Sequence, residues 1–263
     1  MDIIVDGKTA HAATGSRQGS ADEPAVILVH GAGLDRTIWQ MQTRNIAFQQ
    51  RRAYAVDLPG HGRSYGPVLT RVPEMADWII RFMDAAGIET ATLMGHSMGS
   101  LITLDAASRY PDRTEHLILT GVAEAMPVHP DLLAAADANE PLAPELIVFW
   151  GLGEKAQTGG HPLPGLWVHG ASEVLLKNAK DGVLGNDLAA CNDYDGVIGA
   201  AEKISCPTDF VLGRDDKMTP AKSGAALADR IDGAKVNILE RCGHMMMIER
   251  PNEMYNALRG IIF

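Results

Sequence analysis

The pentapeptide Gly95-His96-Ser97-Met98-Gly99 constrains this chain more than any other feature. It joins an apolar run, Thr92 to Met94, to an amphipathic helical pattern that extends from Leu101 to Tyr110. A strand-to-helix turn that holds a serine hydroxyl clear of the backbone requires a strained conformation at the serine. Glycines two positions before and after the serine keep side chains out of such a turn. The pattern therefore predicts this turn, with Ser97 at its apex as a candidate nucleophile.

Short apolar runs recur along the chain without the polar alternation of a half-exposed strand. Such runs are typical of parallel strands that are buried on both faces of a sheet. They occupy Ala25 to Val29, Ala53 to Val56, Ala91 to Met94, Leu117 to Leu119, Phe210 to Leu212 and Val236 to Leu239. Helical patterns lie between them, and the clearest runs from Pro73 to Ala86 with its apolar residues on one face.

The N-terminal residues predict a different kind of strand pairing. Asp2 to Val5 and Lys8 to Ala12 flank Asp6-Gly7, a pair that tolerates the positive φ angles of a tight hairpin turn. Strands that alternate with helices form a parallel sheet covered on both sides. The expected fold class is therefore α/β, a mostly parallel sheet with helices on both faces and an N-terminal antiparallel hairpin.

One segment, from about residue 124 to residue 205, interrupts the alternation of strands and helices. Its helix-like stretches are separated by loops rich in glycine and proline, and they lie at residues 131–139, 172–179 and 187–190. We expect a helical cap insertion at residues 124–205 within one core of residues 1–123 and 206–263. After this segment, Thr219-Pro220 predicts the N-cap and first residue of a helix, and Pro251 predicts the start of the last helix.

The composition excludes several classes of partner. The formal charge is -10 and no stretch is rich in lysine or arginine, which argues against nucleic acid because phosphate binding needs clustered cations. The acidic N-terminus and the absence of a long apolar stretch lead us to expect neither a secretion signal nor a membrane partner. Cys191, Cys206 and Cys242 are odd in number and lack CxxC spacing, which predicts reduced thiols in a cytoplasmic protein.

A serine needs assistance to attack a substrate, because its hydroxyl is a weak nucleophile at its own pKa. It requires a base within hydrogen-bond reach and a carboxylate that orients the base. Gly213-Arg214-Asp215-Asp216 closes the run Phe210 to Leu212, and Cys242-Gly243-His244 follows the next run. The carboxyl ends of parallel strands meet at one edge of a sheet, where ligands of open α/β folds bind. We therefore expect an acid and a histidine to gather beside Ser97.

The order nucleophile, acid and base along the chain resembles the α/β-hydrolase family. Two further segments share the pattern of that family, His30-Gly31-Ala32-Gly33 and Asp57-Leu58-Pro59-Gly60-His61-Gly62-Arg63-Ser64. The resemblance covers the chain from Ala25 to its end, apart from the expected cap. It implies an α/β-hydrolase fold in which Ser97 is the nucleophile and His244 is the base.

The same resemblance places the acid on Asp216 in preference to its neighbour Asp215, since adjacent side chains diverge. The backbone N–H groups of Met98 and Ala32 are expected to form the oxyanion hole. Met98 would begin a helix, and Ala32 lies in a loop of small residues that a carbonyl group can approach. Ser100 stands where the family often has a further glycine, a departure that affects only assignment to a subfamily.

Other histidines have alternative roles. His61 is the main rival as the base, because its loop is expected at the same edge of the sheet. The ring of His96 is expected to point away from the serine and to pack within the sheet, and His30 is expected to brace a loop. His161 and His169 lack metal-ligand spacing, and the loop after the first central strand fails the GxGxxG pattern. No metal and no nucleotide cofactor are therefore expected.

The expected partner is a small-molecule substrate, a largely uncharged ester, lactone or related acyl compound that forms a covalent acyl-enzyme. Trp150 and Trp167 are candidate lining residues of its pocket, and the alternative is that they belong to the cap's own core. Carbon–carbon bond hydrolases of ring-cleavage products are a second interpretation, although they often carry asparagine where this chain has His96. A ligand receptor with the same fold is a third. The sequence leaves the oligomeric state open, a homodimer included.

Overall fold

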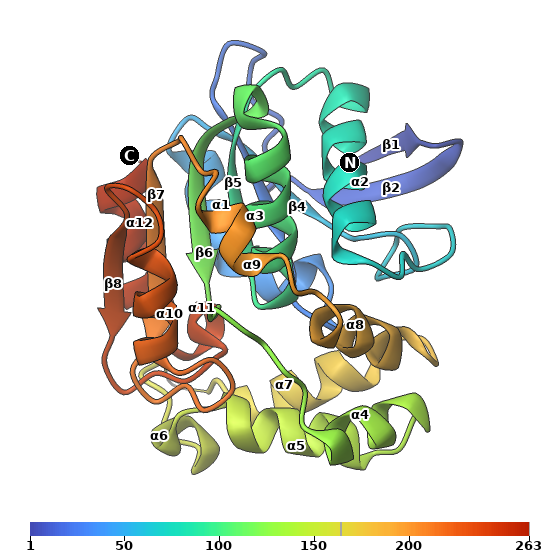
Figure 1. Cartoon of the computed structure of the whole chain (residues 1–263), viewed down its shortest axis with the longest axis vertical. Helices are drawn as coiled ribbons and strands as arrows, with labels where there is room; N and C mark the ends of the chain where they lie inside the picture. Colours follow the sequence, from blue (N-terminus) through green and yellow to red (C-terminus); the bar gives the residue numbers. More distant parts are fainter. Residues whose placement is uncertain (164, 263) are drawn as a thin grey trace.

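The computed structural model describes residues 1–163 and 165–262, and an eight-stranded sheet forms its centre (Figure 1). The strands are β1 (Asp2–Val5), β2 (Lys8–Ala13), β3 (Ala25–Val29), β4 (Arg52–Val56), β5 (Ala91–His96), β6 (Thr114–Thr120), β7 (Thr208–Gly213) and β8 (Lys235–Leu239). They lie in the order β1-β2-β4-β3-β5-β6-β7-β8. The pairs β1–β2 and β2–β4 are antiparallel, and all other neighbours are parallel. The predicted sheet and its N-terminal hairpin are confirmed.

Strand β3 illustrates why an apolar run becomes a central strand. All of its residues are buried. Val26 and Leu28 belong to the core cluster on one face of the sheet, and Ile27 and Val29 belong to the cluster on the other. Successive side chains of a strand point to opposite faces, so a run without polar alternation fills both layers.

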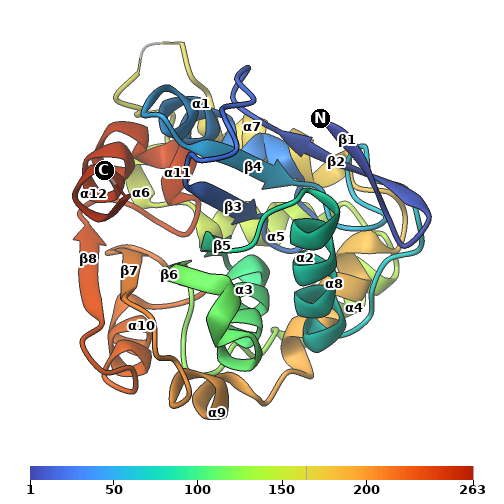
Figure 2. The ribbon, with the colours of Figure 1, turned by 90° about the horizontal axis from the view of Figure 1, so that it is seen from above.

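Helices cover both faces of the sheet (Figure 2). One face is covered by α2 (Val72–Ala85), α3 (Met98–Arg109), α9 (Val197–Ala201) and α10 (Ala221–Ala228). The other is covered by α1 (Gln40–Phe48), α11 (Met246–Glu249) and α12 (Pro251–Ile262). Within residues 1–163 and 165–262, no helix combines the length and the apolar character that crossing a bilayer requires.

The segment between β6 and β7 supplies the remaining α-helices. They are α4 (Pro130–Asp137), α5 (Leu142–Gly151), α6 (Glu154–Gln157), α7 (Val168–Lys177) and α8 (Val183–Asn192), followed by α9. Helices α4 to α8 lie beyond the ends toward which β6 and β8 point, which are the carboxyl ends of the strands (Figure 1). Helix α9 instead packs beside α3 in the layer on the sheet. The division of the chain at residues 124 and 205 stays a prediction.

The start of α10 differs from the expectation. Pro220 precedes the helix with φ -53° and ψ 136°, and Ala221 is the first helical residue. Thr219 does not cap the helix, because its hydroxyl donates a hydrogen bond to Asp216 Oδ2 instead. The expectation for Pro251 is confirmed, since α12 begins there.

Candidate active site

Ser97 forms the turn between β5 and α3, with φ 54° and ψ -117°. A positive φ is uncommon and strained for a residue that carries a Cβ. A Cβ at Gly95 would lie 2.1 Å from the Gly99 carbonyl oxygen, and a Cβ at Gly99 would lie 2.2 Å from the Val29 carbonyl oxygen. The backbone therefore requires glycine at both positions, for the steric reason that the pattern suggested.

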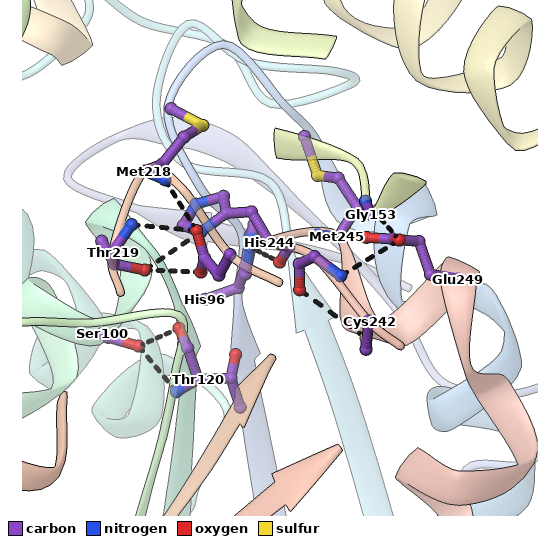
Figure 3. A network of polar contacts seen from close by, with 12 residues as sticks. His96, Ser100, Thr120, Gly153, Met218, Thr219, Cys242, His244, Met245 and Glu249 are labelled. Carbon is purple, nitrogen blue, oxygen red and sulfur yellow. Dashed lines mark hydrogen bonds and ion pairs between the residues drawn. The ribbon is translucent and has the colours of Figure 1, made fainter. Parts of the chain in front are cut away.

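Ser100 follows this turn and joins β5 to β6 (Figure 3). Its hydroxyl oxygen accepts a hydrogen bond from the Thr120 N–H at 3.0 Å and lies 2.8 Å from the Gly95 carbonyl oxygen. Buried hydroxyl groups need such partners, because water cannot reach them. A serine fits here in place of glycine since the two strand ends bind its hydroxyl.

Four donors surround the buried carboxylate of Asp216. His244 Nδ1 donates to Oδ2 at 2.8 Å, and the Thr219 hydroxyl donates to the same oxygen at 2.7 Å. The backbone N–H groups of Met218 and Thr219 each donate to Oδ1 at 2.9 Å (Figure 3). Burial acts to raise the pKa of Asp216, but His244 and Thr219 hold that pKa below its ordinary value. The carboxylate is therefore ionised at neutral pH.

Asp215 has no such partners. It is half-buried, and within the described residues its side chain forms neither a hydrogen bond nor an ion pair. Its backbone N–H donates to the Cys242 carbonyl at 2.8 Å, which fixes the loop after β7 against the loop after β8. The structure thus brings Asp216 to His244 and leaves Asp215 outside the pair.

His244 is held through its backbone as well as its ring. Its N–H donates to the Gly151 carbonyl at 2.5 Å, and its carbonyl accepts from His96 Nε2 at 2.9 Å (Figure 3). The rings of the two histidines have centroids 4.7 Å apart. Burial and the neighbouring His244 lower the pKa of His96 to about 3, so His96 is a neutral donor. His96 therefore supports His244 directly, a contact that the sequence did not predict.

Ser97, His244 and Ala32 line one cavity of about 380 Å³. Within the described residues, no hydrogen bond joins the Ser97 hydroxyl to the His244 ring. Hydrogen bonds between catalytic groups are often long before substrate binds and tighten in the complex. The nucleophile candidate and the base candidate thus share a cavity without being locked to each other.

Helices α5 and α8 complete the wall of the cavity. Trp150 from α5 and Leu188 from α8 are among its apolar lining residues. Trp167 lies elsewhere, in a surface groove beside α7, and is 65% exposed. Its indole packs back over Gly170, where a Cβ would lie 2.3 Å from the ring. The structure therefore brings only the first of the two candidate tryptophans to the site.

The two expected oxyanion donors lie at the same end of the sheet. Met98 is the first residue of α3, and the first N–H groups of a helix have no partner within the helix. In the described part of the chain, the Ala32 N–H has no acceptor either. The next N–H, that of Gly33, donates to Asp187 Oδ2 at 2.8 Å. This bond fixes the loop and leaves the Ala32 N–H available.

Asp187 also binds His61, the rival base. His61 Nε2 lies 2.8 Å from Asp187 Oδ2, and Nδ1 lies 3.0 Å from the Pro59 carbonyl oxygen. Both ring nitrogens therefore face acceptors, which favours the doubly protonated ring. Burial acts to lower the pKa of His61, but the Asp187 carboxylate and the Pro59 carbonyl raise that pKa above its ordinary value. A buried, charged His61 outside the cavity is unsuited to be the base of Ser97.

This charge predicts a pH dependence of stability. A group with a raised folded-state pKa stabilises the fold below its unfolded pKa, and that contribution is lost as pH rises through the folded value. The charged groups near His61 are the carboxylates of Asp187 and Asp57. The ring of His30 also lies beside it, with the two ring centroids 4.8 Å apart. We expect the advantage of the native protein over H61Q in free energy of unfolding to shrink as pH rises above about 6.5. Denaturant titrations from pH 5 to pH 9 measure it, and a constant difference would mean that folding leaves the pKa of His61 unshifted.

His30 connects two loops at the same edge. Its Nδ1 donates to the Gly31 carbonyl at 2.9 Å, and its Nε2 accepts from the Leu58 N–H at 3.2 Å. Burial and the neighbouring His61 lower the pKa of His30 to about 4, so it is neutral. It joins the loops after β3 and β4, in keeping with the bracing role expected of it.

Glu249 was not singled out from the sequence, yet it fixes both sides of the His244 loop (Figure 3). Its Oε2 accepts from the N–H groups of Gly153 at 2.9 Å and Gly243 at 3.1 Å, and its Oε1 accepts from that of Met245 at 3.1 Å. Burial raises the pKa of Glu249, against the effect of these bonds. The carboxylate ties the residues on either side of His244 to the end of α5.

Cys191 lines the cavity but is unsuited to be a second nucleophile. Burial and the nearby Asp187 raise the pKa of its thiol far above the usual range, so the reactive thiolate is not formed at neutral pH. In residues 1–163 and 165–262, no group of three or more His, Cys, Asp or Glu side chains could hold a metal ion.

Comparison with known proteins shows that this chain is similar to several enzymes. Residues 26–258 match the sequence model of the Alpha/beta hydrolase family. 3-Oxoadipate enol-lactonase 2 of Acinetobacter baylyi is 26% identical over 93% of this chain and 90% of its own length. 2-Hydroxy-6-oxo-6-phenylhexa-2,4-dienoate hydrolase of Comamonas testosteroni is 29% identical over 89% of this chain and 85% of its own. The crystal structure of an enol-lactonase from Burkholderia xenovorans LB400 superposes with a TM-score of 0.87 at 21% identity, covering 99% of this chain and 98% of that one.

Proposed function

Since the chain belongs to the alpha/beta hydrolase family, we propose that it is a serine hydrolase of small or medium esters and lactones. The observation that carries this proposal is the cavity shared by Ser97, in its strained turn, and by His244, which is bonded to the buried Asp216. A hydroxyl, an imidazole and a carboxylate in this order form the arrangement that activates serine for acyl transfer.

The proposed reaction follows from the protonation of the imidazole. His244 Nδ1–H donates to Asp216, which leaves Nε2 free to accept the proton of Ser97. Ser97 Oγ then bonds to the carbonyl carbon, and the N–H groups of Ala32 and Met98 stabilise the resulting oxyanion. His244 returns the proton to the leaving alcohol as the carbon–oxygen bond breaks. A water molecule deprotonated by His244 finally releases the acid from Ser97.

The reaction class is supported by the cavity and by the relatives. A mainly apolar cavity of about 380 Å³ suits a compact acyl compound. One relative is a 3-oxoadipate enol-lactonase, and a solved structure with 24% identity and a TM-score of 0.81 is described as an N-acyl homoserine lactone degrading enzyme. Lactones and small esters are therefore the first substrates to test.

Carbon–carbon bond hydrolysis is the second candidate. Its support is the 29% identity to the dienoate hydrolase of Comamonas testosteroni over 89% of this chain. Turnover of a ring-fission dienoate, with simple esters and lactones left intact, would favour this second candidate over the first.

Labelling with a fluorophosphonate tests the nucleophile independently of the substrate. We expect mass spectrometry to find the adduct on Ser97 and to find none on the S97A protein. A panel of nitrophenyl esters of increasing acyl length then measures the size of the cavity. Stoichiometric binding of an ester without repeated turnover would instead indicate a ligand receptor.

A further inference from the structure

Lys217 is an exposed residue that lines the Ser97 cavity. The described residues that line this cavity include no aspartate or glutamate, although the chain has 33 acidic and 23 basic residues. Lys217 Nζ lies 5.9 Å from the centroid of the Phe149 ring, and among the described residues no carboxylate lies within ion-pair distance of it. An unpaired cation beside an apolar cavity attracts anions.

His129 adds a second donor to the same wall. Its Nδ1 accepts from the Asp131 N–H at 3.3 Å, which leaves Nε2 as the donor of the ring. The carboxylate of Asp131 is 81% exposed and is not among the lining residues. The wall thus combines Lys217 with the His129 ring, whose centroid lies 5.4 Å from that of the Trp150 ring.

We propose that Lys217 binds a carboxylate at the far end of the substrate, so that the enzyme acts on half-esters or lactones that carry a free carboxylate. This inference rests on the proposed function of Ser97 and adds the substrate class to it. It departs from the largely uncharged substrate that the sequence suggested. The apolar lining of the cavity suits the hydrocarbon chain that would separate the ester from the carboxylate.

Two esters of equal acyl length test the charge. Monomethyl adipate and methyl hexanoate differ in the terminal carboxylate alone. We expect kcat/KM to favour the adipate half-ester by roughly tenfold, the effect of one charge-assisted hydrogen bond. K217M should abolish this preference, and K217E should reverse it. If K217M keeps the preference, the lysine only covers the Phe149 ring with its stem and the proposal is wrong.

Lys235 offers a matched control for the change in net charge. It begins β8 at the opposite edge of the sheet and is exposed. K235E changes the net charge as K217E does, so we expect it to leave the ratio of the two kcat/KM values unaltered. An equal effect of both substitutions would assign the preference to the field of the whole protein and overturn the assignment to Lys217.

A binding measurement separates this inference from the proposed nucleophile. Calorimetry of monomethyl adipate with S97A and with S97A/K217E needs no turnover. We expect Kd to rise roughly tenfold with K217E, and methyl hexanoate to show no such change. Equal affinities for the half-ester would overturn the inference even if Ser97 proves to be the nucleophile. Conversely, near-native hydrolysis by S97A would contradict the nucleophile and leave the difference in Kd intact.

Discussion

Replacing Ser97 by alanine is expected to lower kcat for an ester by about six orders of magnitude, to the level left by substrate binding and the oxyanion donors. The substitution removes the oxygen that forms the covalent intermediate, and alanine fits the space of serine. Rapid-mixing assays of the native protein and long incubations of S97A with a nitrophenyl ester measure kcat over this range. Both proteins must be free of esterases from the expression host.

Ser108→Ala is the matched control, because Ser108 lies on the same helix and its hydroxyl donates to the Asp105 carbonyl at 2.8 Å, away from the Ser97 cavity. We expect its kcat to equal that of the native protein. Near-normal turnover by S97A would mean that water attacks the substrate directly, and the covalent mechanism would then have to be abandoned.

Replacing Asp216 by asparagine is expected to lower kcat by about four orders of magnitude at neutral pH. Asparagine Oδ1 can still accept from the N–H groups of Met218 and Thr219, but its amide then donates toward His244 Nδ1. That contact forces the imidazole proton onto Nε2, where it blocks the acceptance of the Ser97 proton. The loss should appear in kcat, with the fluorescence and melting temperature of the protein little changed.

Asp215→Asn provides the control, since it makes the same chemical change at the adjacent carboxylate. Its side chain lacks a hydrogen-bond partner among the described residues, so we expect kcat within about twofold of the native value. If D215N proves inactive and D216N active, the orienting acid is the other aspartate.

The strands were the most predictable part of the fold. Runs such as Ala25 to Val29 are buried on both faces, so their sequence carries a strong apolar signal. The start of β6 gave no such signal, because Glu115 and His116 lie near the surface there. Helix α5 was missed for the opposite reason. Its run from Ile147 to Trp150 is apolar without a helical period, and Pro144 fits only because it lies in the first turn.

The site was predictable where a motif fixes both spacing and chain order. Ser97, Asp216 and His244 follow strand ends, and parallel strands bring such positions to one edge. Asp187 and Glu249 had no comparable signal, since each is a single acid within a helix. Their roles depend on backbone N–H groups of distant loops, as in the bond from Gly33 to Asp187 across 154 residues. Such partners become visible only when the chain is folded.

The position of Asp187 limits how this protein can be recombined with its relatives. The residue comes from α8, while His61 and Gly33 come from loops of the sheet. A chimera that imports another protein's helices without an acceptor here would leave the buried Gly33 N–H and His61 ring without their partner, at a cost of about 1–3 kcal/mol for each. Engineering of new specificities is therefore safer by exchanging individual wall residues, such as Leu132 and Trp150, than by transplanting the whole helical segment.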